Sequence, residues 1–285
     1  MRSAAAITMV YNESENLPFW ERHYRRQVGT ENCFVLDHGS NDQSVEQHIG
    51  LNIIRLPRTP FDDAARARAV SDFAASLRPY FKYVIYSDAD ELVVSDPLHS
   101  QTLEEFCEKF EGSSINSVGF DVCHNITDEP AIDSTQPVSV QRSLLRFNSA
   151  VCKPNIARPG VSWSSGFHGC ENDLLFGNIY LFHCHFADQE RALRRLQLTR
   201  SLEWADSRAG RHQRVPDDVI NGYFMSLSAM PVEPEADLSE SNPKIHDYLT
   251  TVKKTAIKFG SSISPPFDLL SDTLFRIPNR FKGSF

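Results

Sequence analysis

The chain has 285 residues, of which 41% are hydrophobic and 23% are charged. These proportions are typical of a folded globular protein and exclude a disordered, collagen-like or low-complexity chain. The 29 lysine and arginine residues are outnumbered by 37 aspartate and glutamate residues, so the formal net charge is −8. This charge argues against a general nucleic-acid-binding protein, which would present a basic face, but it leaves local binding of phosphates through a metal ion open.

The sequence has no feature typical of a membrane-spanning or secreted protein. No apolar run approaches the roughly 20 residues that a transmembrane helix needs. The short apolar run 4–10 lacks a small-residue cleavage pattern, so we interpret it as a strand rather than a signal peptide. The six cysteines stand singly, and we expect reduced thiols rather than disulfides or zinc ligands. We therefore expect a cytoplasmic protein.

The first 91 residues alternate short apolar runs with longer amphipathic stretches. A helix is expected over 14–27, with Asn12 or Ser14 as its cap, and another from Asp62 to Leu77. Strands are expected over 5–10, 33–36, 53–56 and 83–86. This order predicts an α/β fold with a mostly parallel central sheet that helices cover on both faces.

Beyond residue 91 the pattern becomes less regular. The expected elements are a helix over 103–110, strands over 118–122, 144–147 and 179–182, an irregular stretch over 148–173, and a basic helix over 189–205. At most two further helices follow. With no internal repeat and no clear linker, the sequence predicts one domain spanning residues 1–285.

Polar side chains follow three of the predicted strands, at the point where each strand ends. They are Tyr11-Asn12-Glu13, Asp37 and Asp88-Ala89-Asp90-Glu91. Each cluster alone is open to a simpler interpretation as a solvated turn, a helix cap or an Asx-turn. Because ligands of open α/β sheets bind at the carboxyl ends of the strands, the three clusters together predict a binding site there.

Asp88 and Asp90 are the strongest candidates for metal ligands. Two residues apart at a strand end, their carboxylates are expected to point the same way and to approach one Mn²⁺ or Mg²⁺ ion, which prefer oxygen ligands. His183 and His185, at the end of a later strand, are candidates for a further ligand. The alternatives are a surface carboxylate pair and, for His185, a histidine of the core or of a helix cap.

Two other stretches have both a functional and a structural interpretation. Trp163 lies in a loop rich in serine and glycine, where its ring can stack on a sugar or fill the edge of the core. The arginines of the 189–205 helix are most simply a solvated face.

The order of these motifs resembles family 2 type glycosyltransferases with the GT-A fold. The resemblance rests on Tyr11-Asn12-Glu13, on Asp37-His38-Gly39-Ser40-Asn41-Asp42 and on Asp88-Ala89-Asp90-Glu91, which is similar to the Asp-x-Asp-Glu form of a bacterial branch. Gly166-Phe167-His168 and the 183–188 segment are similar to later elements of that branch. The resemblance covers about residues 4–195.

The resemblance implies a division of labour along the chain. Residues 1–95 would form a nucleotide-binding half and 96–205 a metal and acceptor half. Residues 206–285 lie beyond the resemblance, and we expect them to form a helical C-terminal extension. The implied nucleotide-binding residues are Tyr11, Asn12, Glu13, Asp37, Arg66 or Arg68, and Asp88. The implied metal ligands are Asp88, Asp90, His183 and His185, and the implied contacts to the sugar or acceptor are Trp163 and Glu91.

The resemblance also implies the reaction. A sugar would pass from a nucleotide sugar, a UDP-sugar above all, to a hydroxyl of a glycan or lipid-linked acceptor, with inversion at the anomeric carbon. Such transfer needs the charge of the leaving diphosphate to be neutralised and the acceptor hydroxyl to lose its proton. Candidates for the base are Asp121, His168, Glu171 and Asp173. A role in bacterial surface polysaccharide synthesis follows from the same resemblance.

Two other classes of protein remain as alternatives. A sugar-nucleotide nucleotidyltransferase would have a similar sheet and metal, but it would carry a glycine-rich basic loop where this chain has Tyr11-Asn12-Glu13-Ser14-Glu15. A non-catalytic nucleotide- or glycan-binding protein of the same fold is the second alternative, and the presence of Asp88, Asp90 and both late histidines argues against it.

Overall fold

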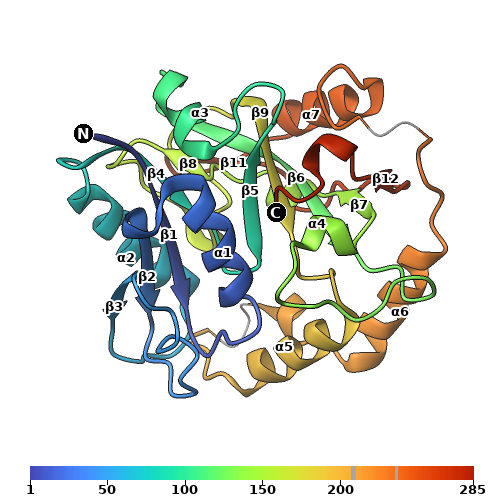
Figure 1. Cartoon of the computed structure of the whole chain (residues 1–285), viewed down its shortest axis with the longest axis horizontal. Coiled ribbons are helices and arrows are strands. Elements are labelled where there is room, and N and C mark those ends of the chain that lie inside the picture. Colours follow the sequence, from blue (N-terminus) through green and yellow to red (C-terminus); the bar gives the residue numbers. More distant parts are fainter. Residues whose placement is uncertain (207–209, 235–236) are drawn as a thin grey trace.

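A computed structural model describes residues 1–206, 210–234 and 237–285 of the chain. In these residues, one mixed sheet of ten strands is flanked by helices, which confirms the predicted α/β class (Figure 1). A separate two-stranded hairpin consists of β10 (Ile257–Phe259) and β11 (Ser262–Ser264). None of the described helices combines the length and the apolar character needed to cross a bilayer.

The N-terminal part of the sheet is parallel. Its strands lie in the order β3-β2-β1-β4, with bounds β1 Arg2–Val10, β2 Cys33–Asp37, β3 Asn52–Arg55 and β4 Phe81–Tyr86. All four predicted strands are confirmed to within two or three residues. Because the strands run the same way, their carboxyl ends meet at one edge, which brings the three predicted polar clusters to that edge.

The helices of this part cover opposite faces of the sheet. Helices α1 (Leu17–Val28) and α3 (Leu103–Lys109) share a buried cluster with Ala4 and Ala6 of β1. Helix α2 (Asp63–Ser76) shares another with the alternate residues of β1, among them Ile7. The period of two along a buried strand thus sends successive side chains to the two helical layers.

The rest of the sheet is largely antiparallel. It contains β5 Glu91–Ser95, β6 Ser114–Cys123, β7 Leu144–Phe147, β8 Ile156–Ala157, β9 Phe176–His183 and β12 Phe275–Arg276. β6 and β9 run parallel to each other, and β5 pairs with the other edge of β9 in the antiparallel sense. Strands β5, β8 and β12 were not predicted, because each is short and gains its order from pairing with distant strands.

The remaining helices lie mainly in the C-terminal part. They are α4 Val138–Gln141, α5 Gln189–Ser201, α6 Asp217–Ser228 and α7 Pro243–Lys254, with 3₁₀ turns at Thr30–Asn32, Ser149–Val151, Ser165–Phe167, Arg211–Arg214 and Asn279–Phe281. The expected helical extension is therefore joined to the sheet through β12. The C-terminal Phe285 also stacks on Phe182 of β9, with ring centroids 3.9 Å apart.

The start of α1 differs from the prediction. The helix begins at Leu17 with Asn16 as its N-cap residue, rather than at Asn12 or Ser14. Asn12 adopts a positive φ of 50°, and its side-chain amide donates to Asn41 Oδ1 while its Oδ1 accepts from the main-chain amide of Asn41, in the loop after β2. Asparagine tolerates this left-handed conformation, so Asn12 makes a tight corner between strand and helix instead of capping the helix.

Helix α1 fixes the segment that links β4 to β5. Its Trp20 indole donates a hydrogen bond to Ser87 Oγ at 2.9 Å, and the Tyr24 hydroxyl contacts the main chain of both Glu91 and Val93. All of these groups are buried. Buried, satisfied hydrogen bonds of this kind restrict the backbone, so the turn that carries Asp88 and Asp90 has a defined position.

The packing of α1 against β5 also predicts that the protein is less stable in acid, because His23 of α1 is buried there. This side chain is 1% exposed, and its Nε2 lies 2.7 Å from the carbonyl oxygen of Val93. Burial lowers the pKa of His23 to about 4, although the hydrogen bond to Val93 favours the protonated ring and partly opposes this shift. The unfolded chain binds a proton near pH 6.5 and the folded chain does not, so stability falls as the pH drops from 6.5 towards 4.

We expect this loss to approach about 3 kcal/mol at pH 4, as the shift in pKa implies. Urea unfolding of the wild type and of His23→Gln over pH 7 to 4 measures it. The glutamine variant should start less stable and should lose less stability on acidification. Equal slopes for the two proteins would refute this account of His23.

Candidate metal and donor site

Asp90, His183 and His185 come together at the edge of the sheet where β4 ends. Glu91 pairs with His183 across β5 and β9, which places Asp90 beside Cys184, whose amide donates to the Asp90 carbonyl at 2.7 Å. Asp90 Oδ2 lies 3.5 Å from His183 Nε2 and 3.7 Å from His185 Nδ1. One ligand atom from each of the three residues lies within 4.8 Å of the others. The spacing fits a single metal ion bound by one carboxylate and two imidazoles, and we call Asp90, His183 and His185 the metal group.

The orientation of His183 also fits a metal ligand. Its Nδ1 lies 2.7 Å from Asp121 Oδ1, because Asp121 and His183 are paired residues of β6 and β9. The other oxygen of Asp121 accepts a hydrogen bond from Asn148 at 2.8 Å. A carboxylate that accepts the Nδ1 proton leaves Nε2 free for a metal ion, which is the usual outer-shell partner of a metal-bound histidine.

The charges of this group are strongly coupled. Burial opposes the ionisation of Asp90, but the imidazoles of His183 and His185 hold the pKa of its carboxyl well below the usual range. Burial likewise opposes the charge on His183, but Asp90 and Asp121 raise its pKa well above the usual range. A metal ion bound here has to displace the proton of His183, so binding releases a proton.

Asp88 lies outside this group, contrary to the simple expectation for residues two apart at a strand end. The backbone turns after Ser87, with the Glu91 amide donating to the Asp88 carbonyl at 2.9 Å, so the two carboxylates diverge. Asp88 instead accepts from Arg66 at 3.2 Å, from Lys153 at 3.2 Å and from the Tyr86 hydroxyl at 2.9 Å. Arg66 of α2 does reach this edge of the sheet.

Lys153 is a central residue of the site that sequence analysis missed. Its side chain is buried between two carboxylates, 2.5 Å from Glu91 and 3.2 Å from Asp88. Burial disfavours its charge, but Glu91 and Asp88 together raise its pKa. Glu91 is itself only 1% exposed, and burial raises its pKa against the opposing effect of Lys153. As placed, Glu91 is an anchor for Lys153 rather than a side chain open to a sugar.

The predicted nucleoside-binding residues lie at the ends of β1 and β2. Asp37 is fully buried, and its oxygens accept from the Ser40 amide at 2.7 Å and from Arg55 at 2.9 Å. The Arg58 guanidinium covers the ring of Tyr11, 3.7 Å from its centroid. The bond from Ser40 to Asp37 spans three residues, so it orders the loop after β2 but is not the Asx-turn that was the alternative for Asp37. A nucleobase at Tyr11 would take the place of Arg58.

The arginines of α5 are more than the expected solvated face, because some of them form ion pairs with the β1–α1 loop, although Arg194 and Arg200 are exposed. Arg195 lies 2.7 Å from the buried carboxylate of Glu13, and Arg194 lies 2.7 Å from Glu15. Burial raises the pKa of Glu13, which Arg195 partly opposes. The β1–α1 loop is thus fastened to α5 by ion pairs, a link between residues about 180 positions apart.

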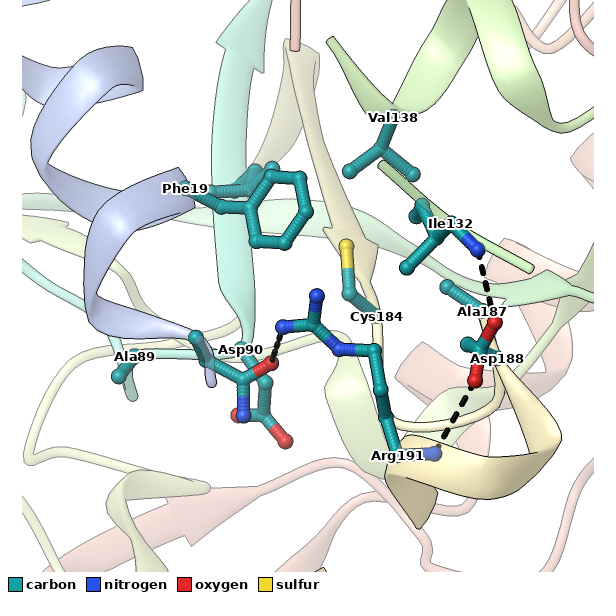
Figure 2. A pocket seen from close by; sticks show the side chains of 11 residues that line it. Phe19, Ala89, Asp90, Ile132, Val138, Cys184, Ala187, Asp188 and Arg191 are labelled. Atoms are coloured by element: carbon teal, nitrogen blue, oxygen red, sulfur yellow. Dashed lines mark hydrogen bonds between the residues drawn. The ribbon is translucent and has the colours of Figure 1, made fainter. Parts of the chain in front are cut away.

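Arg191 extends from α5 into a small pocket next to Asp90 and Cys184 (Figure 2). Its guanidinium donates to the Glu15 carbonyl and, at 3.2 Å, to Asn16 Oδ1, and it lies 4.6 Å from the Phe19 ring. The Asp188 carboxylate caps the first turn of α5 by accepting from the Arg191 amide. These contacts place a further cation close to the metal group.

The other predicted site residues lie apart from the metal group. His168 Nδ1 is 2.7 Å from the Ala150 carbonyl oxygen, Glu171 accepts from the Ser162 amide, and Asp173 is exposed. Trp163 is 5% exposed, and its indole donates to the Pro154 carbonyl at 2.8 Å. Its ring therefore belongs to the edge of the core, the structural alternative of the two weighed for it.

No protein-family model matches the chain, and no curated protein matches it in sequence. Among solved structures, it is similar to a cytidylyltransferase from Leptospira borgpetersenii serovar Hardjo-bovis, with 11% identity and a TM-score of 0.26 over 47% of this chain and 58% of that one. It is also similar to a mannose-1-phosphate geranyltransferase from Thermus thermophilus, with 12% identity and a TM-score of 0.27 over 78% of this chain and 64% of that one. The chain spans less than two thirds of the length of either protein. Similarities this low assign no activity, so function has to be argued from the site.

Proposed function

We propose that this protein is a metal-dependent glycosyltransferase that moves a sugar from a nucleotide sugar to a hydroxyl acceptor. The observation that carries the proposal is the group of Asp90, His183 and His185 at the carboxyl edge of the parallel strands. In open α/β sheets this edge is where nucleotides bind. The resemblance of the sequence to family 2 type glycosyltransferases supplies the reaction class, the preference for a UDP-sugar and the glycan or lipid-linked acceptor.

The donor set favours Mn²⁺ over Mg²⁺. Mg²⁺ is bound mainly by oxygen ligands, whereas imidazole suits transition metals and carboxylate suits Mn²⁺. When bound, such an ion would take up negative charge that develops on the leaving diphosphate. Asp90, His183 and His185 would hold it, and Asp121 would orient His183. Because both oxygens of Asp121 are engaged, we assign it a positioning role rather than that of the base.

The cationic side chains around the metal group are suited to a diphosphate. Arg66, Lys153, Arg191 and Arg195 all lie near the same edge, and each is paired with a carboxylate or a carbonyl group. Their carboxylate partners keep the charge of this edge balanced. We propose that a bound diphosphate recruits Arg66 and Arg195, the two arginines that pair with Asp88 and Glu13 of the predicted donor-binding residues, while Lys153 stays between Asp88 and Glu91.

A screen of nucleotide sugars for release of nucleoside diphosphate tests the proposal. With Mn²⁺ the protein should release the diphosphate from at least one donor, and with EDTA it should not. A nucleotidyltransferase would instead form pyrophosphate from a nucleoside triphosphate and a sugar 1-phosphate. Formation of pyrophosphate without release of nucleoside diphosphate would contradict glycosyl transfer.

The positioning role of Asp121 predicts a graded effect. In Asp121→Asn the amide at this position no longer holds the Nδ1 proton of His183 as a carboxylate does, so the affinity for Mn²⁺ should fall about 10- to 100-fold. Calorimetric titration with Mn²⁺ measures this. Asp72→Asn, which changes an exposed carboxylate of α2, is the matched control and should bind as the wild type does. Unchanged affinity in Asp121→Asn would remove Asp121 from the site.

A further inference from the structure

A second cavity lies between α2, the loop 162–165 and the β10–β11 hairpin. Its volume is about 530 Å³, within the range of small-molecule sites. Ala64 and Ala67 of α2 form a wall of small side chains. The lining is rich in hydroxyl groups, contributed by Ser162, Ser164, Ser165, Ser261 and Ser262.

The polar groups of this cavity include two that form no interaction within the described part of the protein. Arg68 forms no ion pair or hydrogen bond with the residues that the structure describes, and the hydroxyl of Ser262 is shielded and finds no partner among them. Glu171 also lines the cavity, where it accepts from the Ser162 amide. A guanidinium donates, a carboxylate accepts and hydroxyls do both. This mixture suits a ligand with many hydroxyl groups, and the carboxylate disfavours an anion.

An exposed aromatic ring stands at the rim. Phe259 is 84% exposed at the end of β10, beside the two-residue turn in which Gly260 has a φ of 61°. The hairpin is fixed beside the loop 162–165, since the Ile263 amide donates to the Cys170 carbonyl at 2.7 Å and Cys170 forms a β-bridge with Trp163. Burial of Phe259 contributes little to folding. A flat ring held at the rim of a hydroxyl-rich cavity is suited to stack on the C–H face of a sugar ring.

The cavity is also linked to the candidate metal and donor site. Helix α2 sends Arg66 to Asp88 and, two residues later, Arg68 to the cavity. Trp163 lines the cavity, and its ring centroid lies 6.0 Å from that of Tyr86, whose hydroxyl donates to Asp88. The rings of Trp163 and Tyr86 thus connect the lining of the cavity to Asp88.

We propose that this cavity binds a neutral sugar unit of the acceptor. Phe259 stacks on the sugar ring, while Arg68, Glu171 and the serine hydroxyls bind its hydroxyl groups. That the sugar belongs to an acceptor rests on the proposed function, whereas the binding of a sugar rests on the cavity alone.

Saturation-transfer NMR on the EDTA-treated protein tests the inference with the methyl glycosides of glucose, galactose, mannose and N-acetylglucosamine. At least one glycoside should receive saturation from the protein. Because a stacked aromatic contact is worth about 0.5–1.5 kcal/mol, Phe259→Ala should weaken binding by about 2- to 10-fold. Tyr80→Ala removes another aromatic ring, 63% exposed and outside this cavity, and should bind as the wild type does. Both variants change exposed side chains, so both should fold.

Transfer to none of the four glycosides, or equal binding by the wild type and Phe259→Ala, would overturn the inference. The release of nucleoside diphosphate by the wild type without acceptor is a separate readout. Diphosphate release without glycoside binding refutes this inference alone. Glycoside binding that depends on Phe259, without diphosphate release, refutes the proposed function and leaves the sugar site standing.

Discussion

Asp90→Asn is expected to abolish the Mn²⁺-dependent release of nucleoside diphosphate, with a fall of at least about 100-fold. The carboxylate of Asp90 is the one anionic group in the set of three ligands, so its amide analogue weakens the hold on the metal ion most. Stabilisation of the leaving charge by a metal ion is worth several kcal/mol, and each 1.36 kcal/mol is about a factor of ten in rate. Initial rates at saturating donor measure the change.

The fold of this variant should persist, because the two histidines and Asp121 remain and the substitution keeps the shape of the side chain. Asp72→Asn, on an exposed position of α2, is the matched control and should release diphosphate at the wild-type rate. Far-UV circular dichroism and melting curves establish the fold of both. Wild-type rates in Asp90→Asn at saturating Mn²⁺ would exclude Asp90 as a metal ligand in the reaction.

Lys153→Met is expected to lower the free energy of unfolding by about 3–5 kcal/mol. The substitution leaves the buried carboxylate of Glu91 without an ion-pair partner among the described residues and removes one of the two cations at Asp88, which keeps Arg66. Removing one partner of a buried ion pair is strongly destabilising because the other charge remains buried. Urea unfolding measures the loss, and Lys254→Met on the exposed face of α7 should change stability by less than about 0.5 kcal/mol.

A second substitution distinguishes the loss of an ion pair from the loss of packing. Glu91→Gln combined with Lys153→Met removes both charges, so the double variant should be more stable than Lys153→Met alone. If the stability lost by the double variant equals the sum of the losses of Glu91→Gln and Lys153→Met measured separately, the ion pair contributes nothing. The effect of Lys153→Met then comes from packing.

The first half of the fold could be predicted because its signals are local. The runs that became β1, β2, β3 and β4 are apolar, bounded by turn residues and separated by helical periodicity. The parallel arrangement then follows from the order of the elements. The meeting of three polar clusters at one edge was predicted for the same reason, since the edge of a parallel sheet collects the ends of all its strands.

The details of the site could not be predicted because they depend on the path of the backbone and on distant partners. The divergence of Asp88 from Asp90 follows from a turn directly after β4, which strand periodicity does not anticipate. Lys153 stands in an irregular stretch without a local motif, and only tertiary packing brings it to Glu91. Likewise, the ion pair of Arg195 with Glu13 joins residues that lie far apart in the sequence. The pairing of Asp121 with His183 needed the register of β6 and β9.

Two elements that were not predicted, β5 and the β10–β11 hairpin, have only weak local signals in the sequence. Leu92-Val93-Val94 is an apolar run of three residues, too short to predict β5 by periodicity. Gly260 with Ser261 between two short β-prone runs is a hairpin signal for β10 and β11. Both elements matter to the account, because β5 places Asp90 beside β9 and the hairpin places Phe259 at its cavity.

The central claim, that Asp90 and two histidines hold a metal ion, is tested most directly by pulsed electron paramagnetic resonance of the Mn²⁺-loaded protein. Nitrogen hyperfine coupling from directly bound imidazole should be present in the wild type. It should weaken when either His183 or His185 is replaced by alanine, and should disappear when both are replaced. A Mn²⁺ spectrum without directly bound nitrogen, or one unchanged in the double variant, would contradict the account.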